Sequence, residues 1–426
     1  MPHPIRIAIS GGGLAGATLF HALHRFPHLD VHIFESASTF HESGMAIGVT
    51  RNAQAALELM SPTAVQTLER AGAVPMRGVR FILAQGEEQG KVIGEVDEKT
   101  AGKCLTSIVH RAAFLQELLA DAPAERLHAS KKLEGVDRRA DQSLTLHFTD
   151  GTSHEYDILI GADGIHGTVR KIVLERSAAA MPRSTGIWMV MSLQPYAEAQ
   201  ASIGKGTIDL EQAREYSWIG QGTYLLHNLL SDGQLVQFVI ASKDKEGEPE
   251  QWHRTVSNSE IKSLYQKWPQ HLSKAVNELF CKETEHRAMY LWEHPPAPTY
   301  VSGPLCVMGD AAHATTPWQG SGGGMSIEDS LILSTLLGRS NTPGDALAAL
   351  KAYDQVRRPR TQRIVESSRI TGSILTGTNE EMRQYVDTPG KLLKRWDFIL
   401  DIDMEKHRDE AISIMEQELR VAWGLV

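Results

Sequence analysis

The sequence has 426 residues, which is enough for two or three domains and a sizeable core. Hydrophobic residues make up 42%, which excludes a largely disordered chain, and the net charge of −9 includes no basic block, which argues against nucleic acid as a partner. Cys104, Cys281 and Cys306 form no CxxC pair, so neither a zinc site nor a disulfide framework is indicated. Without a signal peptide or a run of about 18 apolar residues, we expect a cytoplasmic protein with no membrane span.

The first 35 residues predict a strand, a glycine turn, a helix and a second strand. Ile5 to Ile9 is a short apolar strand, and helical spacing runs from Leu14 to about Phe26. A second apolar strand follows at residues 31–34. The segment is therefore a βαβ unit at its minimum length.

The rest of the chain alternates between the periodicities of strands and helices. Helical spacing is expected at 52–72, from near residue 111, at 258–280, at 324–337 and over most of 343–420. Strands are expected within 78–109 and at 143–148, 154–160, 186–193, 222–229, 234–241 and 304–309. This alternation, with an inserted strand-rich stretch, indicates an α/β fold with a second sheet.

The glycine turn, GGGLAG at residues 11–16, matches the GxGxxG pattern. Gly11 permits the tight turn, Gly13 lets the backbone approach a pyrophosphate, and Gly16 lets the helix pack closely on the strand. Glu35 ends the second strand about 20 residues on, where a carboxylate can accept hydrogen bonds from ribose hydroxyls. The arrangement predicts dinucleotide binding and does not separate FAD from NAD.

Two later segments carry further signals. Residues 157–164, DILIGADG, predict a strand that ends in an Asp-Gly turn and are followed by Val169 and Arg170. Residues 309–313, GDAAH, lead into PWQGSGGG at 317–324. Four glycines in five positions give up chain entropy, which is expected where backbone lies against a flat ligand.

Together, these segments resemble the class A flavoprotein monooxygenases, the group that contains para-hydroxybenzoate hydroxylase. Residues 294–298, 319–328, 353–363 and 395–397 are similar to its salicylate hydroxylase branch, and the resemblance covers nearly the whole chain. It implies FAD as cofactor, NAD(P)H as a transient co-substrate, and O2 with a small organic molecule as substrates.

The resemblance also assigns cofactor roles residue by residue. It places Glu35 at the adenosine ribose, Arg111 at the FAD phosphates and Asp163, and Asp310 at a ribityl hydroxyl. The backbone N–H groups after the helix start stabilise negative charge on the flavin. Glu328 and Asp329 are expected to be ordinary first-turn acids. The complete set of expected cofactor-binding residues is Gly11, Gly13, Gly16, Glu35, Gly48, Arg111, Asp163, Gly164, Asp310, Gly320, Gly322 and Gly323.

The implied fold is a Rossmann-like FAD-binding domain with an inserted mixed-sheet substrate domain and a helical C-terminal region. Residues 1–180 and 284–345 are expected to form the FAD-binding domain. Residues 181–283 are expected to form the substrate sheet, and residues 346–426 the helical region.

Two residues on the strand at 223–229 are candidate catalytic groups. Tyr224 shares a face with Leu226 and Asn228, whereas His227 lies on the other face. Tyr224 stands where members of the resembled family place a polar catalytic or substrate-positioning residue. His227 is the alternative, because a histidine can remove a phenolic proton near neutral pH.

Two departures from the family pattern affect substrate handling. Gly167 stands where the family often has serine in its Asp-Gly motif, which weakens the expectation of efficient NAD(P)H use. No Arg or Lys occurs between Thr185 and Gln200, around Met191, where related enzymes often carry an arginine. We therefore expect salicylate, a carboxylate, to be a poor substrate.

The implied activity is hydroxylation of a small aromatic or related electron-rich substrate by a single-component enzyme, through a flavin C4a-hydroperoxide. Alternatives are epoxidation or dearomatising hydroxylation of a larger natural product, and a flavin-binding protein without turnover. A halogenase is disfavoured because the Trp-x-Trp-x-Ile-Pro signature is absent. The oligomeric state stays open, with a homodimer among the possibilities.

Overall fold

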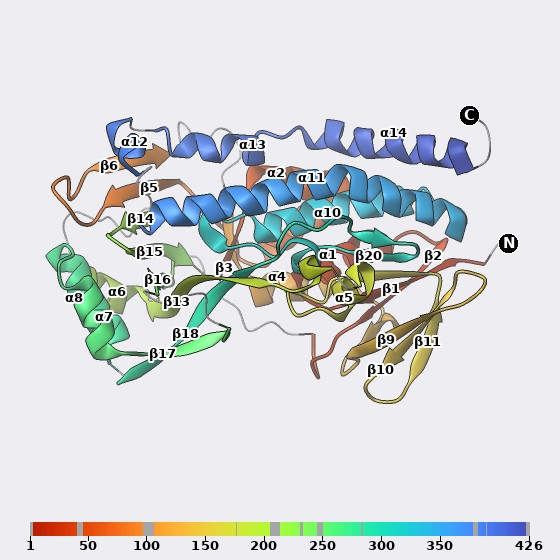
Figure 1. The fold of residues 1–426 in the computed structure, drawn as a ribbon, viewed down its shortest axis with the longest axis horizontal. Coiled ribbons are helices and arrows are strands. Elements are labelled where there is room, and N and C mark those ends of the chain that lie inside the picture. The colour runs from red at the N-terminus through yellow and green to blue at the C-terminus, as the bar shows by residue number, and fades with distance from the viewer. Residues whose placement is uncertain are drawn as a thin grey trace.

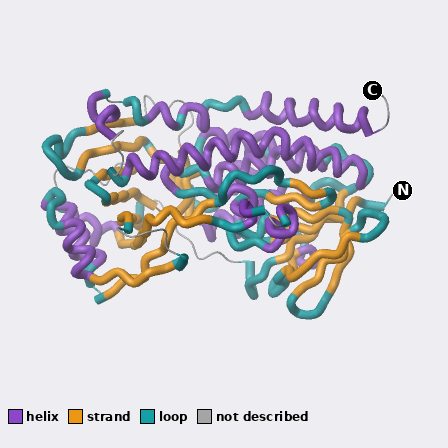
Figure 2. The backbone as a smooth tube through the Cα atoms, in the orientation of Figure 1, coloured by secondary structure: helices purple, strands orange, loops and turns teal. Residues whose placement is uncertain are grey.

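The computed structural model describes residues 3–40, 46–96, 106–175, 177–204, 214–230, 233–244, 250–282, 284–377, 382–388 and 390–422. Two sheet regions lie side by side beneath a layer of long helices, with both chain ends near the same end of the molecule (Figure 1). Coloured by secondary structure, the longest helices form the upper layer, and most strands lie below it together with shorter helices (Figure 2).

The expected βαβ unit forms the centre of a six-stranded sheet. β1 (Ile5–Ser10) and β2 (Leu29–Phe34) pair in parallel, and α1 (Leu14–Leu23) connects them. The strand order is β19-β20-β12-β1-β2-β8. The other strands are β8 (Leu127–His128), β12 (Ile158–Gly161), β19 (Val301–Ser302) and β20 (Leu305–Val307). Because β1, β12 and β20 are parallel neighbours, the loops after all three leave the same edge of the sheet.

Long helices cover this sheet and share its apolar core. α10 (Gly322–Leu337) packs against α1, α2 (Arg51–Met60) and α11 (Pro343–Leu375). α14 (Met404–Ala422) lies outside α11, as Figure 1 shows. The other helices here are α3 (Pro62–Arg70), α4 (Arg111–Leu119), α5 (Thr168–Leu174) and α9 (Asp310–His313).

The second sheet has eight strands in the order β17-β18-β13-β16-β15-β14-β5-β6. They are β5 (Gly78–Leu83), β6 (Val92–Val96), β13 (Arg183–Pro195), β14 (Arg214–Ile219), β15 (Thr223–Leu230), β16 (Leu235–Lys243), β17 (His253–Ser257) and β18 (Glu285–Glu293). One face packs on the helices α6 (Tyr196–Ile203), α7 (Asn258–Tyr265) and α8 (Gln270–Phe280). The sheet extends beyond the expected segment 181–283, because β5 pairs in parallel with β14 and β18 pairs with β13.

Two three-stranded sheets and short helices complete the described chain. β9 (Leu133–Arg138), β10 (Leu144–Phe148) and β11 (Ser153–Tyr156) form one sheet; β3 (Ala46–Val49), β4 (Val74–Met76) and β7 (Thr106–His110) form the other. The short helices are η1 (Ala124–Arg126), η2 (Ala178–Ala180), η3 (Pro317–Gln319), α12 (Met382–Asp387), η4 (Leu393–Arg395) and α13 (Asp397–Leu400). None of the described helices is long and apolar enough to cross a membrane.

Two expected elements are each divided in the structure. The helical pattern at 52–72 breaks at Ser61, whose side chain accepts a hydrogen bond from the backbone N–H of Thr63 and caps α3. The alternation at 154–160 breaks at Asp157, which forms an ion pair with Arg6. The strands on either side of Asp157, β11 and β12, therefore belong to different sheets.

A buried ion network joins the helices beneath the glycine-rich loop. Arg357 of α11 donates to Glu328 and Asp329 of α10 at 2.7 and 2.8 Å, and all three side chains are fully buried. Arg360 and Asn52 donate further hydrogen bonds to Glu328. The expectation of ordinary first-turn acids is therefore wrong: α10 begins at Gly322, so both acids lie in its second turn and face α11.

Arg357→Met should strongly destabilise the fold, because it leaves two carboxylates buried without their shared cation. Breaking a buried ion pair in this way costs about 3–5 kcal/mol. The matched control is Arg358→Met, since Arg358 is partly exposed and pairs with Asp354 within α11. The control should cost about 0–1 kcal/mol. Denaturant unfolding of both variants measures the difference, and equal losses would contradict the assigned role of Arg357.

Candidate active site

A cavity of about 990 Å³ runs along the edge of the parallel sheet and continues to the inner face of the second sheet. The structure brings most of the expected site residues together along its wall: Gly11, Gly13, Glu35, Gly48, Arg111, Asp163, Gly164, Tyr224, Asp310, Gly320, Gly322 and Gly323. Gly16 and His227 do not line the cavity.

The glycine turn after β1 is shaped by close backbone contacts. Gly11 has φ +108°, and a Cβ there would lie 2.2 Å from the carbonyl oxygen of Ala162. Gly16 packs on the turn itself, because its Cβ would lie 1.9 Å from the carbonyl oxygen of Gly11. Larger residues at either position would push the turn off β12 and α1. Gly16 therefore supports the turn from outside the cavity.

Glu35 stands at the end of β2, at the far end of the cavity. Its carboxylate accepts hydrogen bonds from the backbone N–H groups of Gly12 and Ala37, each at 2.7 Å. These bonds hold the carboxylate beside the glycine turn and leave it acceptor capacity for ribose hydroxyls.

The Asp-Gly turn after β12 faces the glycine turn. One oxygen of Asp163 accepts the N–H groups of Thr168 and Val169 at the start of α5. The other oxygen, Oδ1, is buried and has no hydrogen-bond partner among the described residues. Burial raises the pKa of this carboxyl group, and the hydrogen bonds from those N–H groups offset only part of the increase. A Cβ at Gly167 would lie 2.3 Å from Oδ1, so serine would crowd Asp163 here.

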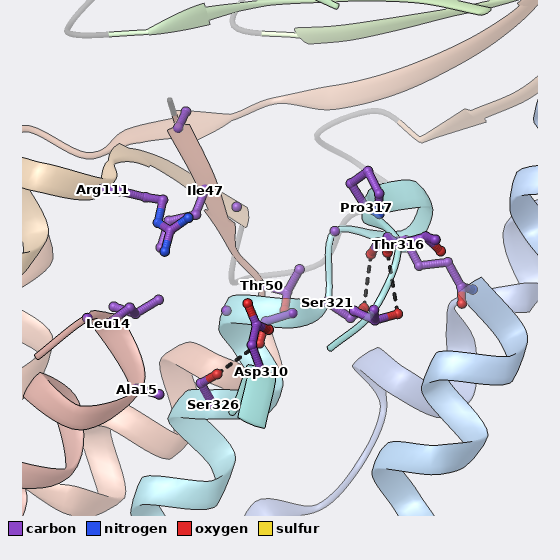
Figure 3. Close-up of a pocket in the computed structure, with 18 of the residues that line it drawn as sticks. Leu14, Ala15, Ile47, Thr50, Arg111, Asp310, Thr316, Pro317, Ser321 and Ser326 are labelled. Atoms are coloured by element: carbon purple, nitrogen blue, oxygen red, sulfur yellow. Dashed lines mark hydrogen bonds between the residues drawn. The ribbon is translucent and has the colours of Figure 1, made fainter. Parts of the chain in front are cut away.

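The middle of the cavity lies between β7 and the segment that leads into α10. Figure 3 shows Leu14 and Arg111 on one side, Thr316 and Pro317 on the other, and Asp310 between them. The Asp310 side chain is exposed at the start of α9. Gly322 and Gly323 form the first turn of α10, so their N–H groups are free of helical partners, as the resemblance implies.

These features fit a bound FAD. The glycine turn leaves room for a pyrophosphate, Arg111 supplies positive charge, and the unpartnered oxygen of Asp163 is available to accept a hydrogen bond from a ligand. The elongated cavity also has the size of a large cofactor pocket, for which about 300–1,000 Å³ is typical.

Beyond the cofactor channel, the cavity opens onto the inner face of the second sheet. Tyr224 and Leu226 of β15, Val239 and Ala241 of β16, and Met189 and Met191 of β13 line this chamber. Trp318 closes it on the flavin side, with its ring 5.3 Å from that of Tyr224 and nearly perpendicular to it. Leu393 and Trp396 of the C-terminal region also line it.

The alternative catalytic residue, His227, lies on the opposite face of the sheet. It is fully buried, stacks on Tyr216 at 4.9 Å and accepts a hydrogen bond from the Trp218 indole at 3.2 Å. Burial lowers the pKa of His227 to about 3, so the ring is neutral. The strand is regular here, and its alternation directs Tyr224 into the chamber and His227 away from it. This geometry gives no support for His227 as a base.

Sequence reasoning missed Glu215 of β14, which lines the chamber, and Ser217, its fully buried neighbour on the same face. Glu215 lines the cavity, and Ser217 is hydrogen-bonded to both Glu215 and Tyr224. The signal was the alternation in REYSWI at 214–219, where Glu215 and Ser217 share one face and two aromatic residues occupy the other. Burial raises the pKa of Glu215 to about 7, and the Ser217 hydrogen bond opposes the shift.

A dinucleotide channel that opens into a separate sheet-lined chamber defines the protein as a dinucleotide-binding protein with a site for a second, small molecule. A family model described as the FAD binding domain matches residues 5–368. The chain belongs to this family and is an FAD-dependent monooxygenase.

Individual relatives extend this result over nearly the whole chain. The 6-methylsalicylate 1-monooxygenase of Aspergillus terreus is 33% identical, over 96% of this chain and 92% of the relative. A salicylate hydroxylase of Pseudomonas putida is 30% identical, over 98% of this chain and 96% of the relative. A solved salicylate hydroxylase substrate complex superimposes with a TM-score of 0.84 at 23% identity, covering 96% of this chain and 98% of that chain, which supports the fold.

Asp310→Ala should weaken FAD binding, because it removes an exposed carboxylate from the middle of the cavity. Losing a hydrogen bond to a charged group costs about 1.5–3 kcal/mol, which corresponds to roughly a 10- to 150-fold rise in Kd. Titration of the apoprotein with FAD measures the change. Glu366→Ala, at an exposed site on α11, is the control. Unchanged FAD affinity in Asp310→Ala would rule Asp310 out as a cofactor ligand.

Proposed function

We propose that the protein uses NAD(P)H and O2 to hydroxylate a small aromatic substrate held in the chamber between the second sheet and the cofactor channel. The observation that carries the proposal is that one continuous cavity joins a glycine-lined cofactor channel to a mostly apolar chamber with a buried tyrosine. The names of the relatives, salicylate hydroxylase and 6-methylsalicylate 1-monooxygenase, support an aromatic substrate.

When bound, FAD supplies the redox chemistry that links NAD(P)H oxidation to oxygen transfer. Those of the proposed cofactor-binding residues that line the cavity would hold it in the channel, with Asp310 and the α10 N-terminus at the end near the chamber. The protein's own part in the chamber is to position the substrate, to exclude water and to control protons.

The C-terminal region helps to exclude water. Trp396 donates its indole N–H to the carbonyl of Gln319 at 3.3 Å, and the Gln319 amide donates to the carbonyl of Arg395 at 2.9 Å. These bonds tie η4 to the loop before α10. Because Trp396 also packs on Phe81 of β5, it bridges the cofactor loop and the substrate sheet.

The function is tested by incubating the FAD-loaded protein with NADPH or NADH, O2 and a panel of simple phenols and aromatic acids. The expected result is substrate-stimulated oxidation of the reductant with a product that carries one additional oxygen atom from O2. A protein that binds FAD but shows no stimulation by any aromatic compound would contradict the proposal and favour a binding role without turnover.

Tyr224→Phe should separate cofactor binding from oxygen transfer, because Tyr224 lines the chamber and no described contact links its hydroxyl to the cofactor-binding residues. FAD content should be unchanged. Product formed per NADPH should fall, with the difference recovered as hydrogen peroxide. Acid–base roles are worth about 100- to 10,000-fold, and a positioning role less.

Tyr216→Phe is the matched control, since Tyr216 is a buried tyrosine on the opposite face of the same sheet. It should retain full coupling. If His227→Ala uncouples the reaction while Tyr224→Phe does not, the assignment of the catalytic face is wrong.

A further inference from the structure

A line of three polar side chains crosses the inner face of the substrate sheet. Glu215 and Ser217 lie two residues apart on β14, and Tyr224 lies on the neighbouring strand β15. The Ser217 hydroxyl donates to Glu215 Oε1 at 3.2 Å, and its oxygen lies 2.7 Å from the Tyr224 hydroxyl. Ser217 is fully buried between the two, while Glu215 and Tyr224 both line the cavity.

The carboxylate fixes the direction of these hydrogen bonds. Ser217 has one hydroxyl hydrogen, and an ionised Glu215 can only accept, so that hydrogen points to Glu215. The Tyr224 hydroxyl must then donate to Ser217. With its hydrogen committed to Ser217, the Tyr224 oxygen can only accept further hydrogen bonds. It can therefore accept one from a donor in the chamber.

The surroundings of Glu215 suit a proton acceptor near neutral pH. Its pKa, raised by burial to about 7, matches the working range of a general base. The charged groups nearby are paired with one another. Arg80 of β5 and Arg214 of β14, the residue before Glu215, both form ion pairs with Glu95 of β6. Burial, and then the charge of Glu215, raise the pKa of Tyr224, so the tyrosine itself rests in its neutral form.

The chamber is also unsuited to an anionic substrate. Among the described residues of the second sheet that line the cavity, none is Arg, Lys or His. Besides Glu215 and Tyr224, the polar residues of this sheet that line the cavity are Asn228 and Gln237, which are neutral amides. A substrate carboxylate placed here would be desolvated without a counter-ion, beside an acidic residue, which is costly.

We propose that Glu215 is the proton acceptor of this site, reached from the substrate through Tyr224 and Ser217, and that the preferred substrate is a phenol without a carboxylate group. This rests on the proposed function and narrows its substrate class. It concerns residues outside the cofactor channel.

The proton step balances as a transfer along the chain. The substrate O–H bond breaks, its electron pair stays on the phenolic oxygen, and the proton forms a bond to the Tyr224 oxygen. The Tyr224 proton moves to Ser217, and the Ser217 proton moves to Glu215. The net result is a substrate phenolate and a neutral glutamic acid, with Ser217 and Tyr224 unchanged. Electron density on the ring rises, which favours attack by an electrophilic oxygen.

The test follows ionisation of a coloured phenol, 4-nitrophenol, bound to the FAD-loaded protein across a pH series. Difference spectra report the bound phenolate directly, without turnover. In the wild-type protein, the bound phenol and Glu215 compete for one proton, so phenolate should form in two steps. Because the charge of ionised Glu215 disfavours a second anion beside it, the midpoint should lie at a higher pH in the wild-type protein than in Glu215→Gln, by about one unit or more, a tenfold change in the ionisation constant. Ser217→Ala, which interrupts the chain, should weaken this coupling and give an intermediate midpoint.

The control is Glu285→Gln, an exposed glutamate on β18 of the same sheet, which should behave as wild type. FAD absorbance checks that each variant is loaded. Identical ionisation of the bound probe in wild type and Glu215→Gln would overturn the role of Glu215. Failure of 4-nitrophenol to bind, or tighter binding of salicylate than of phenol, would overturn the substrate class.

An independent readout comes from stability, because unfolded Glu215 ionises at an ordinary carboxyl pKa whereas the folded group stays protonated up to about pH 7. The folded protein therefore loses stability as pH rises through this window, and Gln at position 215 removes that loss. The stability of Glu215→Gln relative to wild type should rise from pH 4.5 to pH 7 and then level off. A flat difference would contradict an ionising Glu215. Failure of the proposed function would instead appear as absence of any phenol-stimulated NAD(P)H oxidation.

Discussion

The cofactor channel depends on the buried cation of Arg357. This guanidinium joins α11 to both acids of α10. Asp329 also accepts hydrogen bonds from the ring nitrogen of His313 at 2.6 Å and from the backbone N–H of Gly309 at 3.0 Å. The Gly-Asp turn that carries Asp310 and the helix that begins at Gly322 are therefore held by one carboxylate. His313 is explained as a supporting residue of this network. Burial would raise the pKa of Asp329, but His313 and Arg357 outweigh it and hold that pKa below its usual range.

This arrangement compensates for the composition of the loop. Gly320 and the three glycines that begin α10 each cost about 0.5–1 kcal/mol of conformational freedom relative to alanine in regular structure, so this stretch has little rigidity of its own. Arg170 adds a second support, since it donates to the carbonyls of Ala311 and Ala312 at the end of α9. The backbone of the loop can thus face the cofactor on one side, while buried charged residues on the other side hold the loop in position.

The cofactor half of the site was predictable because its signals are local. Each glycine motif follows a strand, and parallel pairing of β1, β12 and β20 brings the three motifs to one sheet edge without further information. The family resemblance then identified FAD, which the family match confirms. The burial of Glu328 and Asp329 was not predictable, because it depends on Arg357, some 29 positions away along the chain.

The substrate half was predicted less completely, because its residues act in combination across strands. The alternation around Tyr224 was correct, and the structure adds which face points inward. Glu215 belongs to no sequence motif. Its link to Tyr224 through Ser217 depends on the register between β14 and β15, in which Ser217 lies opposite Leu226 and Ile219 lies opposite Tyr224. Register between β14 and β15 is a tertiary property, since a shift of one residue would place the carboxylate on the opposite face.

The two halves of the cavity therefore have opposite electrostatic character. The channel contains Arg111 and a helix N-terminus, which suit the phosphates and the electron-rich edge of a flavin. The chamber presents methionines at positions 189 and 191 and a titratable carboxyl group at 215, which suit a neutral ring. Because charge interactions strengthen as water is excluded, the same closure by Trp318 and Trp396 that protects the cofactor also sharpens discrimination against an anion. Cofactor binding and substrate choice can thus be set by separate residues of one continuous cavity, with Tyr224 at the point where they meet.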